Sequence, residues 1–340
     1  MSGAGAPQLL EEDRPTRGKP RTIERGLSRS DRVFRGSSTG VGIFVLVVTG
    51  SIGLFLGLQS IPTFRHYGFS FFTQTNWQPE RDQIGIAAVL VGTVEVALVA
   101  ICVGIPLAMS LALFITEYAP RKLKSWMVSA VDLMAAVPSI LYGLWGFFLL
   151  QPHAKYLARW LSQYLGWIPI FKVSTDPNAA VWQQSAYTSS VFITGIAVSM
   201  MVIPLACAVM RGVFDETPMG EREAALALSG TRFGVIRTVV LPFGRGGIIG
   251  GSMLALGRAL GETIVVLMII SPAYDIKIRI LEAGGQTISA LIAGNFGNAT
   301  SAQLSALLTA GFVLFVITLG VNFFAATVIR KSRSGALTEI

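Results

Sequence analysis

Residues 221–242 read EREAALALSGTRFGVIRTVVLP and lie between two long apolar stretches. The segment mixes charged with small residues, is interrupted at Gly230 and reaches a proline at Pro242. Glycine commonly follows the last residue of a helix, and proline cannot continue one. We therefore predict a short helix, a break at Gly230 and a second helical piece that ends near Pro242. On the residues alone, the segment is either an amphipathic connector or a surface knuckle whose small Ala224 and Ala225 let a partner's backbone come close.

The composition of the whole chain indicates a membrane protein. Of 340 residues, 52% are apolar and only 14% are charged, and the mean hydropathy is +0.61. Ordinary soluble domains carry about 25% charged residues, which they need to cover their surface. This deficit excludes a disordered chain, a coiled coil and an ordinary cytosolic enzyme, and it predicts an all-α polytopic membrane protein.

Six stretches are apolar and long enough to cross a bilayer, which takes roughly 20 helical residues. They are 41–60, 91–115, 127–150, 191–213, 246–270 and 305–329. We expect these spans to form one permease domain over 41–330, with a cytoplasmic loop at about 214–245. Residues 1–40 are expected to be a flexible basic cytoplasmic tail, and 331–340 a short C-terminal one.

The distribution of Lys and Arg predicts the orientation. Nineteen lie in the two tails and the second and fourth loops, against seven in the remaining loops. The richer side is expected to be cytoplasmic, with both termini inside. The net charge of +8 is then explained by topology and by contact of the tail with anionic lipid, and not by nucleic-acid binding. On the other side, Trp160, Tyr164, Trp167 and Trp182 predict a helix lying in the membrane interface.

Metal, cofactor and catalytic sites are not indicated. Cys102 and Cys207 lie in apolar runs, and His66 and His153 are far apart with no ligand at metal-binding spacing. The chain has no phosphate-binding P-loop and no combination of nucleophile and base. We expect no catalytic residues, no metal and no cofactor in this chain.

Charged residues inside the spans are the best candidates for function, because a charge at bilayer depth costs at least about 2.5 kcal/mol unless it is paired or hydrated. Arg258 is at the centre of the fifth span, and Glu262 follows four residues later, which on a continuous helix places both on one face. They are either a substrate site or a structural ion pair. Asp132 is better explained by pairing with an Arg or by reaching the interface, and Glu95 by a position at the outer interface.

The loop at 221–242 resembles the EAA motif of ABC importer permeases, in which Glu-Ala-Ala is followed by Gly and later by Leu-Pro. The matching residues are Glu223, Ala224, Ala225, Gly230, Leu241 and Pro242. The chain departs from the pattern at one point, since Ser229 stands where the family usually has Gly. The resemblance implies that these residues couple the chain to a cytoplasmic ATPase.

Three further stretches resemble permeases of the phosphate (Pst) importers: FITEYAP at 114–120, VPSILYGLWG at 137–146 and LGRALGET at 256–263. With the EAA loop they cover about 40–262, and the long loop after the third span favours the PstC-type subunit. By this resemblance, Arg258 and Glu262 hold functionally important positions in the substrate path.

The resemblance implies the type I ABC importer fold with six transmembrane helices, in a bacterial inner membrane. The implied partners are a second, PstA-type permease, two PstB-type ATPase subunits that bind ATP and Mg, and an external PstS-type phosphate-binding protein. Phosphate is the implied transported ligand. Alternatives are a permease for another oxyanion such as sulfate or molybdate, a secondary transporter that works without ATP, and a membrane sensor.

Overall fold

The computed structural model describes residues 29–174 and 185–333, which are predominantly helical. The longer helices are α1 (Arg29–Tyr67), α3 (Ala87–Leu113), α4 (Arg121–Ala136), α6 (Gln151–Leu165), α7 (Val191–Asp215), α8 (Met219–Ser229), α11 (Arg245–Leu260) and α14 (Ser301–Arg333). The shorter helices are α2 (Ser70–Thr73), α5 (Ser139–Trp145), α9 (Arg232–Val235), α10 (Leu241–Phe243), α12 (Ile264–Ile269) and α13 (Ile288–Asn295). Strands β1 (Trp77–Gln78) and β2 (Gln83–Ile84) pair antiparallel.

The chain divides into residues 1–52 and 53–340, and α1 runs from the first unit into the second. Residues 29–40, which the sequence places in a flexible tail, belong to this helix. The remainder of that predicted tail, and residues 334–340 of the C-terminal one, lie outside the described residues. All packing described below lies within the second unit.

Four helices are long and apolar enough to cross a membrane: Arg29–Tyr67, Ala87–Tyr118, Val191–Asp215 and Ser301–Thr327. Two further segments qualify only as bent pairs, namely Arg121–Ala136 with Ser139–Leu165 and Arg232–Phe243 with Arg245–Leu260. The described part of the chain therefore has six crossings if each bent pair is one span. The first, second, fourth and sixth predicted spans each match a continuous helix.

The third predicted span, 127–150, is not a straight helix. The chain bends by 92° between α4 and α5, at Val137 and Pro138. Proline lacks a backbone N–H and forces the residue before it into an extended conformation, which Val137 adopts at φ −65° and ψ 130°. A hydropathy window averages over such a break and conceals it, although Pro138 is itself a local signal for a bend.

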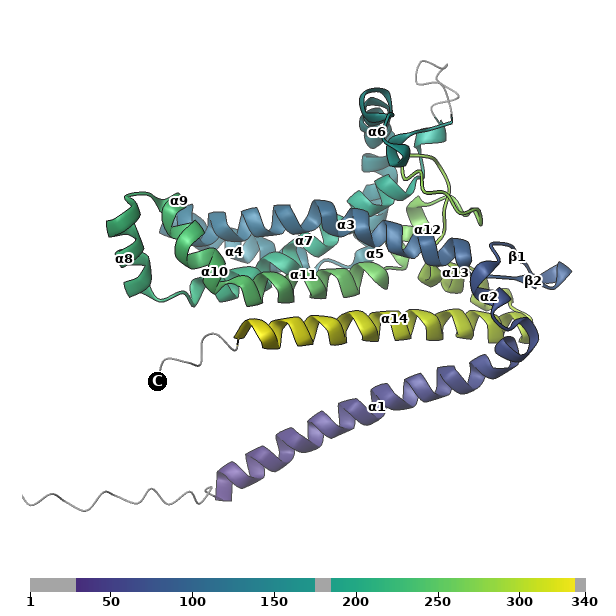
Figure 1. The fold of residues 1–340 in the computed structure, drawn as a ribbon, viewed down its shortest axis with the longest axis horizontal. Coiled ribbons are helices and arrows are strands. Elements are labelled where there is room, and N and C mark those ends of the chain that lie inside the picture. The colour runs from purple at the N-terminus through teal and green to yellow at the C-terminus, as the bar shows by residue number, and fades with distance from the viewer. Residues whose placement is uncertain (1–28, 175–184, 334–340) are drawn as a thin grey trace, which may run out of the picture. The chain divides into compact units, whose positions relative to one another are not determined.

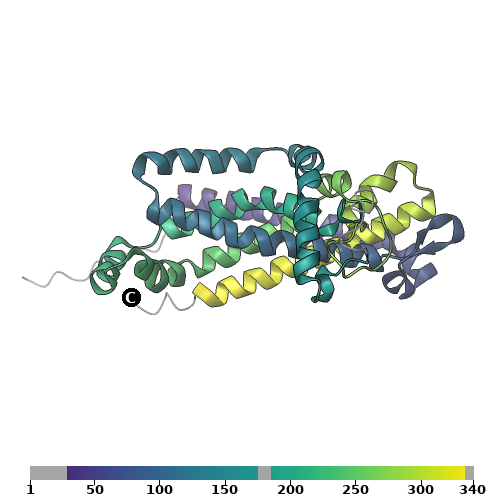
Figure 2. The same cartoon turned by 90° about the horizontal axis from the view of Figure 1, so that it is seen from above.

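The helix after this bend continues through a π-helical turn into α6, which runs across the long helices (Figure 2). Its Trp160 and Tyr164 are exposed, as is Trp167 just beyond its end. The predicted helix after the third span is therefore present, and its place in the membrane interface stays a prediction. Trp182 lies outside the described residues.

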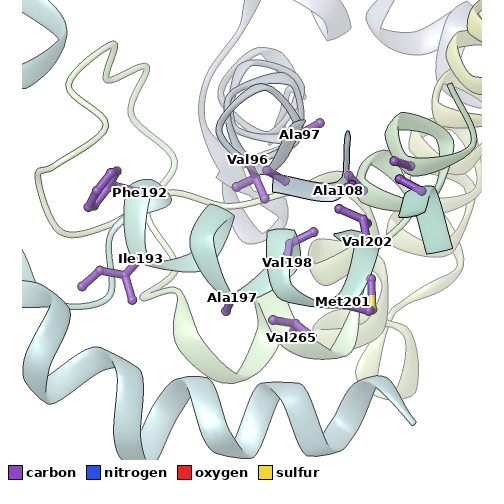
Figure 3. Close-up of a cluster of buried hydrophobic side chains, with 14 of the residues drawn as sticks. Val96, Ala97, Ala108, Phe192, Ile193, Ala197, Val198, Met201, Val202 and Val265 are labelled. Carbon is purple, nitrogen blue, oxygen red and sulfur yellow. The ribbon is translucent and has the colours of Figure 1, made fainter. Parts of the chain in front are cut away.

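The core is built around α3 and α7, which run parallel to each other and pack along much of their length. Figure 3 shows Val96 of α3 directed toward a row of α7 side chains, with Val265 of α12 on the other side of α7. α11 packs on the same pair of helices through small residues. A Cβ on Gly247 would lie 2.6 Å from the Val213 side chain, so only glycine permits this approach.

The ends of the second unit differ in character. Helices α8, α9 and α10 gather at one end, and α2, the β hairpin and α13 gather at the other (Figure 1). At the hairpin end, the Tyr67 hydroxyl donates to the Asp82 carboxylate at 2.6 Å, and the His66 Nε2 lies 2.8 Å from it. These hydrogen bonds, of which the one from Tyr67 is the stronger influence, lower the pKa of Asp82.

Candidate functional site

The α8–α10 segment, residues Met219–Phe243, has the shape that its sequence predicts. α8 ends at Ser229, and Gly230 adopts the left-handed conformation at φ 64°, which glycine tolerates best. The Thr231 side chain then accepts a hydrogen bond from the Gly234 N–H at 3.0 Å and begins the next helix. The break at Gly230 and the second piece ending at about Pro242 are therefore confirmed. Ser229 in place of the usual Gly leaves the turn one residue later, at Gly230.

The surface of this segment is unusually apolar for an exposed one. The Leu228 side chain is 91% exposed and Met219 is 67% exposed, and Phe233 is also exposed. Exposed apolar side chains that cluster on a surface mark a site of interaction. The predicted coupling residues have these positions: Glu223, Ala224, Gly230 and Pro242 are exposed, and Ala225 and Leu241 are half-buried.

Two arginines attach the α8–α10 segment to the end of α3. The Arg222 guanidinium lies 2.9 Å from the Glu117 carboxylate and also donates to the carbonyl of Phe214. Arg232 donates to the carbonyl of Glu117 at 3.2 Å and lies over the ring of Tyr118, 6.0 Å from its centroid. Nothing in the sequence pattern distinguishes Arg222 or Arg232 as partners of Glu117. The FITEYAP stretch that contains Glu117 was the only signal that could have identified it.

Two more ion pairs lie at the same end. The Lys124 ammonium is 2.7 Å from the Asp215 carboxylate, and Arg211 is 3.3 Å from Asp132. The second pair confirms that Asp132 is bound by an arginine. It joins α4 to α7 and leaves α8 untouched.

The fifth predicted span, 246–270, is broken where its charges lie. α11 ends at Leu260, and α12 begins only at Ile264. Arg258 is in the last turn of α11 and exposed, whereas Glu262 is outside the helix and 8% exposed. Placing both charges on one helical face was therefore wrong. Across residues 29–174 and 185–333, no ion pair joins Arg258 to Glu262.

Backbone hydrogen bonds account for the position of Glu262. Its Oε1 accepts from the Val265 N–H at 3.3 Å and so caps the start of α12, and its carbonyl accepts from the Ser289 hydroxyl at 2.7 Å. Thr287 lies 3.3 Å from Ser289 at the start of α13, and the N–H of Ile288 donates to Thr93 of α3 at 3.0 Å. The break is therefore tied to α13 and, through α13, to α3.

Polar groups of other helices surround the end of α11. The Arg258 guanidinium is close enough to Tyr142 of α5 to interact with it electrostatically, and the Tyr142 hydroxyl donates to the carbonyl of Met134 at 2.8 Å. A Cβ built on Gly257 would lie 3.5 Å from Asn322 of α14. Among residues 29–174 and 185–333, Arg258 is thus an exposed cation with no ion-pair partner, an arrangement that suits the binding of an anion.

Glu95 of α3 has different surroundings. It lines a cavity of about 460 Å³ whose other walls are apolar or Cys102. Cys102 and Cys207 are both unpaired thiols. In the part of the chain that the structure describes, no three His, Cys, Asp or Glu residues come together in a way that could hold a metal ion.

Residues 104–334 match the family model described as "Binding-protein-dependent transport system inner membrane component". The chain belongs to this family. It is therefore a membrane permease of a transport system, and not an enzyme.

Proteins similar in sequence include permeases of phosphate transport systems. The chain is 36% identical over 308 residues to the "Phosphate transport system permease protein PstC 2" of Mycobacterium tuberculosis, covering 89% of this chain and 93% of that one. It is also 36% identical over 300 residues to the PstC of Xylella fastidiosa, covering 88% and 90%. Among solved structures, a bacterial ABC transporter that imports the polysaccharide alginate matches with a TM-score of 0.53, at 19% identity over 88% of this chain and 99% of that one. This last similarity confirms the ABC importer permease fold.

Proposed function

We propose that this chain is the PstC-type permease subunit of an ATP-driven phosphate importer. The observation that carries this proposal is the near full-length similarity to phosphate permeases of Mycobacterium tuberculosis and Xylella fastidiosa. Such coverage includes both the α8–α10 segment and the end of α11. In this role the chain supplies half of a translocation path, and a separate subunit hydrolyses ATP.

The exposed side chains of the α8–α10 segment support docking of an ATPase. An apolar, solvent-exposed helix end is stable when a partner covers it. Glu223, Ala224, Ala225 and Gly230 would form the contact, with Leu241 and Pro242 at the end of the segment. We further propose two PstB-type ATPases binding ATP and Mg on the cytoplasmic side, together with both termini. A PstA-type permease would complete the path, and a PstS-type protein would deliver phosphate from outside.

Arg258 is the proposed phosphate ligand. Its guanidinium fork can hold two phosphate oxygens and stays charged at any physiological pH. It is exposed in this chain, so it would face the path shared with the second permease. Glu262 would support the site indirectly, because it fixes the break between α11 and α12 that ends the helix just beyond Arg258.

An importer of another oxyanion, such as sulfate or molybdate, is the main alternative. These anions have the same tetrahedral arrangement of oxygens, and an arginine binds all of them. A secondary transporter that works without ATP would have no use for an exposed docking helix such as α8.

The experiment is uptake of labelled phosphate by proteoliposomes that contain the permease pair, the ATPases and the binding protein. We expect uptake that requires ATP, is blocked by vanadate, and is unaffected by excess sulfate or molybdate. Competition by sulfate or molybdate would contradict the choice of substrate. Uptake without ATP would contradict the importer class.

A further inference from the structure

The end of α3 and the two sides of the Gly230 turn meet at one residue. The Glu117 carboxylate forms an ion pair with Arg222 of α8, and the Glu117 backbone carbonyl accepts a hydrogen bond from Arg232 of α9. Both arms of the α8–α10 segment are therefore attached to the same point, which is the last turn of the long helix from Ala87 to Tyr118. A small hollow of about 180 Å³ beside it is lined by Glu223 and Leu226 as well as these three residues.

The ion pair between Glu117 and Arg222 is largely buried. The Glu117 side chain is 10% exposed, and that of Arg222 is 17% exposed. Screening by solvent is weak at such positions, so the attraction is stronger than in a surface pair and the loss of one partner is more costly. By contrast, the side chains of Lys124 and Asp215 at the same end are 34% and 43% exposed.

α3 is well placed to carry movement from this point into the membrane. It packs along α7 and also contacts α11, the helix that bears Arg258. After Leu113 it continues without a break into a π-helical turn at Phe114–Tyr118, which contains Glu117. A force applied to α8 at Arg222 would therefore reach α3 at its end and α11 through their shared packing.

We infer that Glu117 is a positioning residue that couples the α8–α10 segment to α3, so that movement of the docked ATPase shifts the helices around Arg258. This role rests on the proposed function. It concerns the transmission of movement, and neither the docking surface nor the anion site includes the Glu117 carboxylate. In this arrangement, exposed residues of α8 bind the ATPase, and the Glu117 carboxylate transmits the movement of α8 to α3.

A substitution at Glu117 can test the carboxylate separately from the other contacts of this turn. The hydrogen bond from Arg232 is to the backbone carbonyl of residue 117, and the cation–π contact is to Tyr118, so both survive a change of the Glu117 side chain. Glu117→Gln keeps the size of the side chain and removes only the charge that holds Arg222. Lys124→Gln is the matched control, because it breaks an ion pair at the same end that does not involve α8.

The test is a double-mutant cycle on the assembled complex in proteoliposomes, with phosphate imported per ATP hydrolysed as the readout. We expect Glu117→Gln and Arg222→Gln each to lower this ratio by about tenfold while the ATPase still co-purifies. The double variant should be no worse than Arg222→Gln alone, because both changes break one contact. Lys124→Gln should stay within about twofold of the wild type.

Three outcomes for the measured ratio, and one failure of assembly, would overturn the role of Glu117. The three outcomes are an unchanged ratio in Glu117→Gln, effects of the two changes that multiply in the double variant, and an equal loss in Lys124→Gln. Failure of Glu117→Gln to retain the ATPase would assign the residue to assembly and would also overturn it. Absence of phosphate uptake by the wild-type complex would instead contradict the proposed function, so the two failures are distinguishable.

Discussion

The turn at Gly230 and the break at 261–263 both interrupt a helix next to proposed functional residues, but they are formed in different ways. At Gly230, the left-handed glycine and the Thr231 cap lie within a few residues of the turn. At 261–263, Glu262 caps α12, but its carbonyl is held by Ser289, which is distant in sequence. Interruptions encoded locally can be read from a sequence, whereas those held by distant partners cannot.

The two regions also differ in whether their arginines have protein partners. Near the Gly230 turn, Arg222 and Arg232 contact Glu117, and the large apolar side chains of Leu228 and Phe233 are exposed. Near the 261–263 break, Arg258 is exposed, and the nearby carboxylate of Glu262 is turned to the backbone of α12. The first region is suited to holding a protein, and the second to receiving an anion.

The largest effect is expected at Arg258. Arg258→Gln removes a bidentate charged contact, and we expect phosphate uptake to fall by about 100-fold or more while the complex still assembles. Phosphate uptake by Arg258→Lys should lie between that of the wild type and that of Arg258→Gln, since lysine keeps the charge but lacks the planar guanidinium group. Uptake of labelled phosphate and co-purification of all subunits measure the two properties.

The double variant Arg258→Gln with Glu262→Gln separates the anion site from a structural ion pair. We expect it to assemble and stay inactive. Full uptake by the double variant would show that the two residues balance each other's charge, and it would remove Arg258 from the substrate path.

A smaller effect is expected on the docking surface. Glu223→Lys reverses a charge that borders the hollow between α8 and Glu117, and we expect the amount of ATPase retained on purification to drop by about tenfold. Glu221→Lys, an exposed acid on the same helix that does not line this hollow, is the control. Equal retention by both variants would contradict the proposed role of Glu223.

The cap at Glu262 predicts a loss of stability that depends on hydrogen bonding and not on charge. Glu262→Ala removes the acceptor for the Val265 N–H, and we expect a cost of about 1–2 kcal/mol. Glu262→Gln keeps an acceptor oxygen and should cost less. Thermal unfolding of the purified complex compares the two, and identical melting temperatures would show that the cap contributes nothing.

The smallest effect is expected at the Gly230 turn. Gly230→Ala forces a Cβ into the left-handed conformation at φ 64°, at a cost of about 1 kcal/mol. The matched control is Gly220→Ala in α8, which has open space around the added Cβ, as Gly230 does, but no positive φ. We expect reduced retention of the ATPase in the first variant alone. Equal behaviour of both would mean that the turn is held by its partner and not by glycine.

Much of the fold was predictable because its signals are local. Spans 41–60, 91–115, 191–213 and 305–329 each match a continuous helix, since apolar length by itself requires one in a bilayer. The bend at Pro138 carries a local signal that hydropathy averaging conceals. The role of Glu117 could not be predicted, because its partners Arg222 and Arg232 are about a hundred residues away in the chain.

By itself, the sequence determined that this is a helical membrane protein, and it determined four of the membrane-spanning helices and the turn at Gly230. Each follows from residues next to one another, through hydrophobicity or backbone conformation. Only the tertiary structure decided that Glu262 faces the backbone of α12 while Arg258 is exposed, and that Glu117 joins both arms of the α8–α10 segment. The physical reason is that a charged side chain takes whichever partner the packing of distant helices brings within hydrogen-bonding distance.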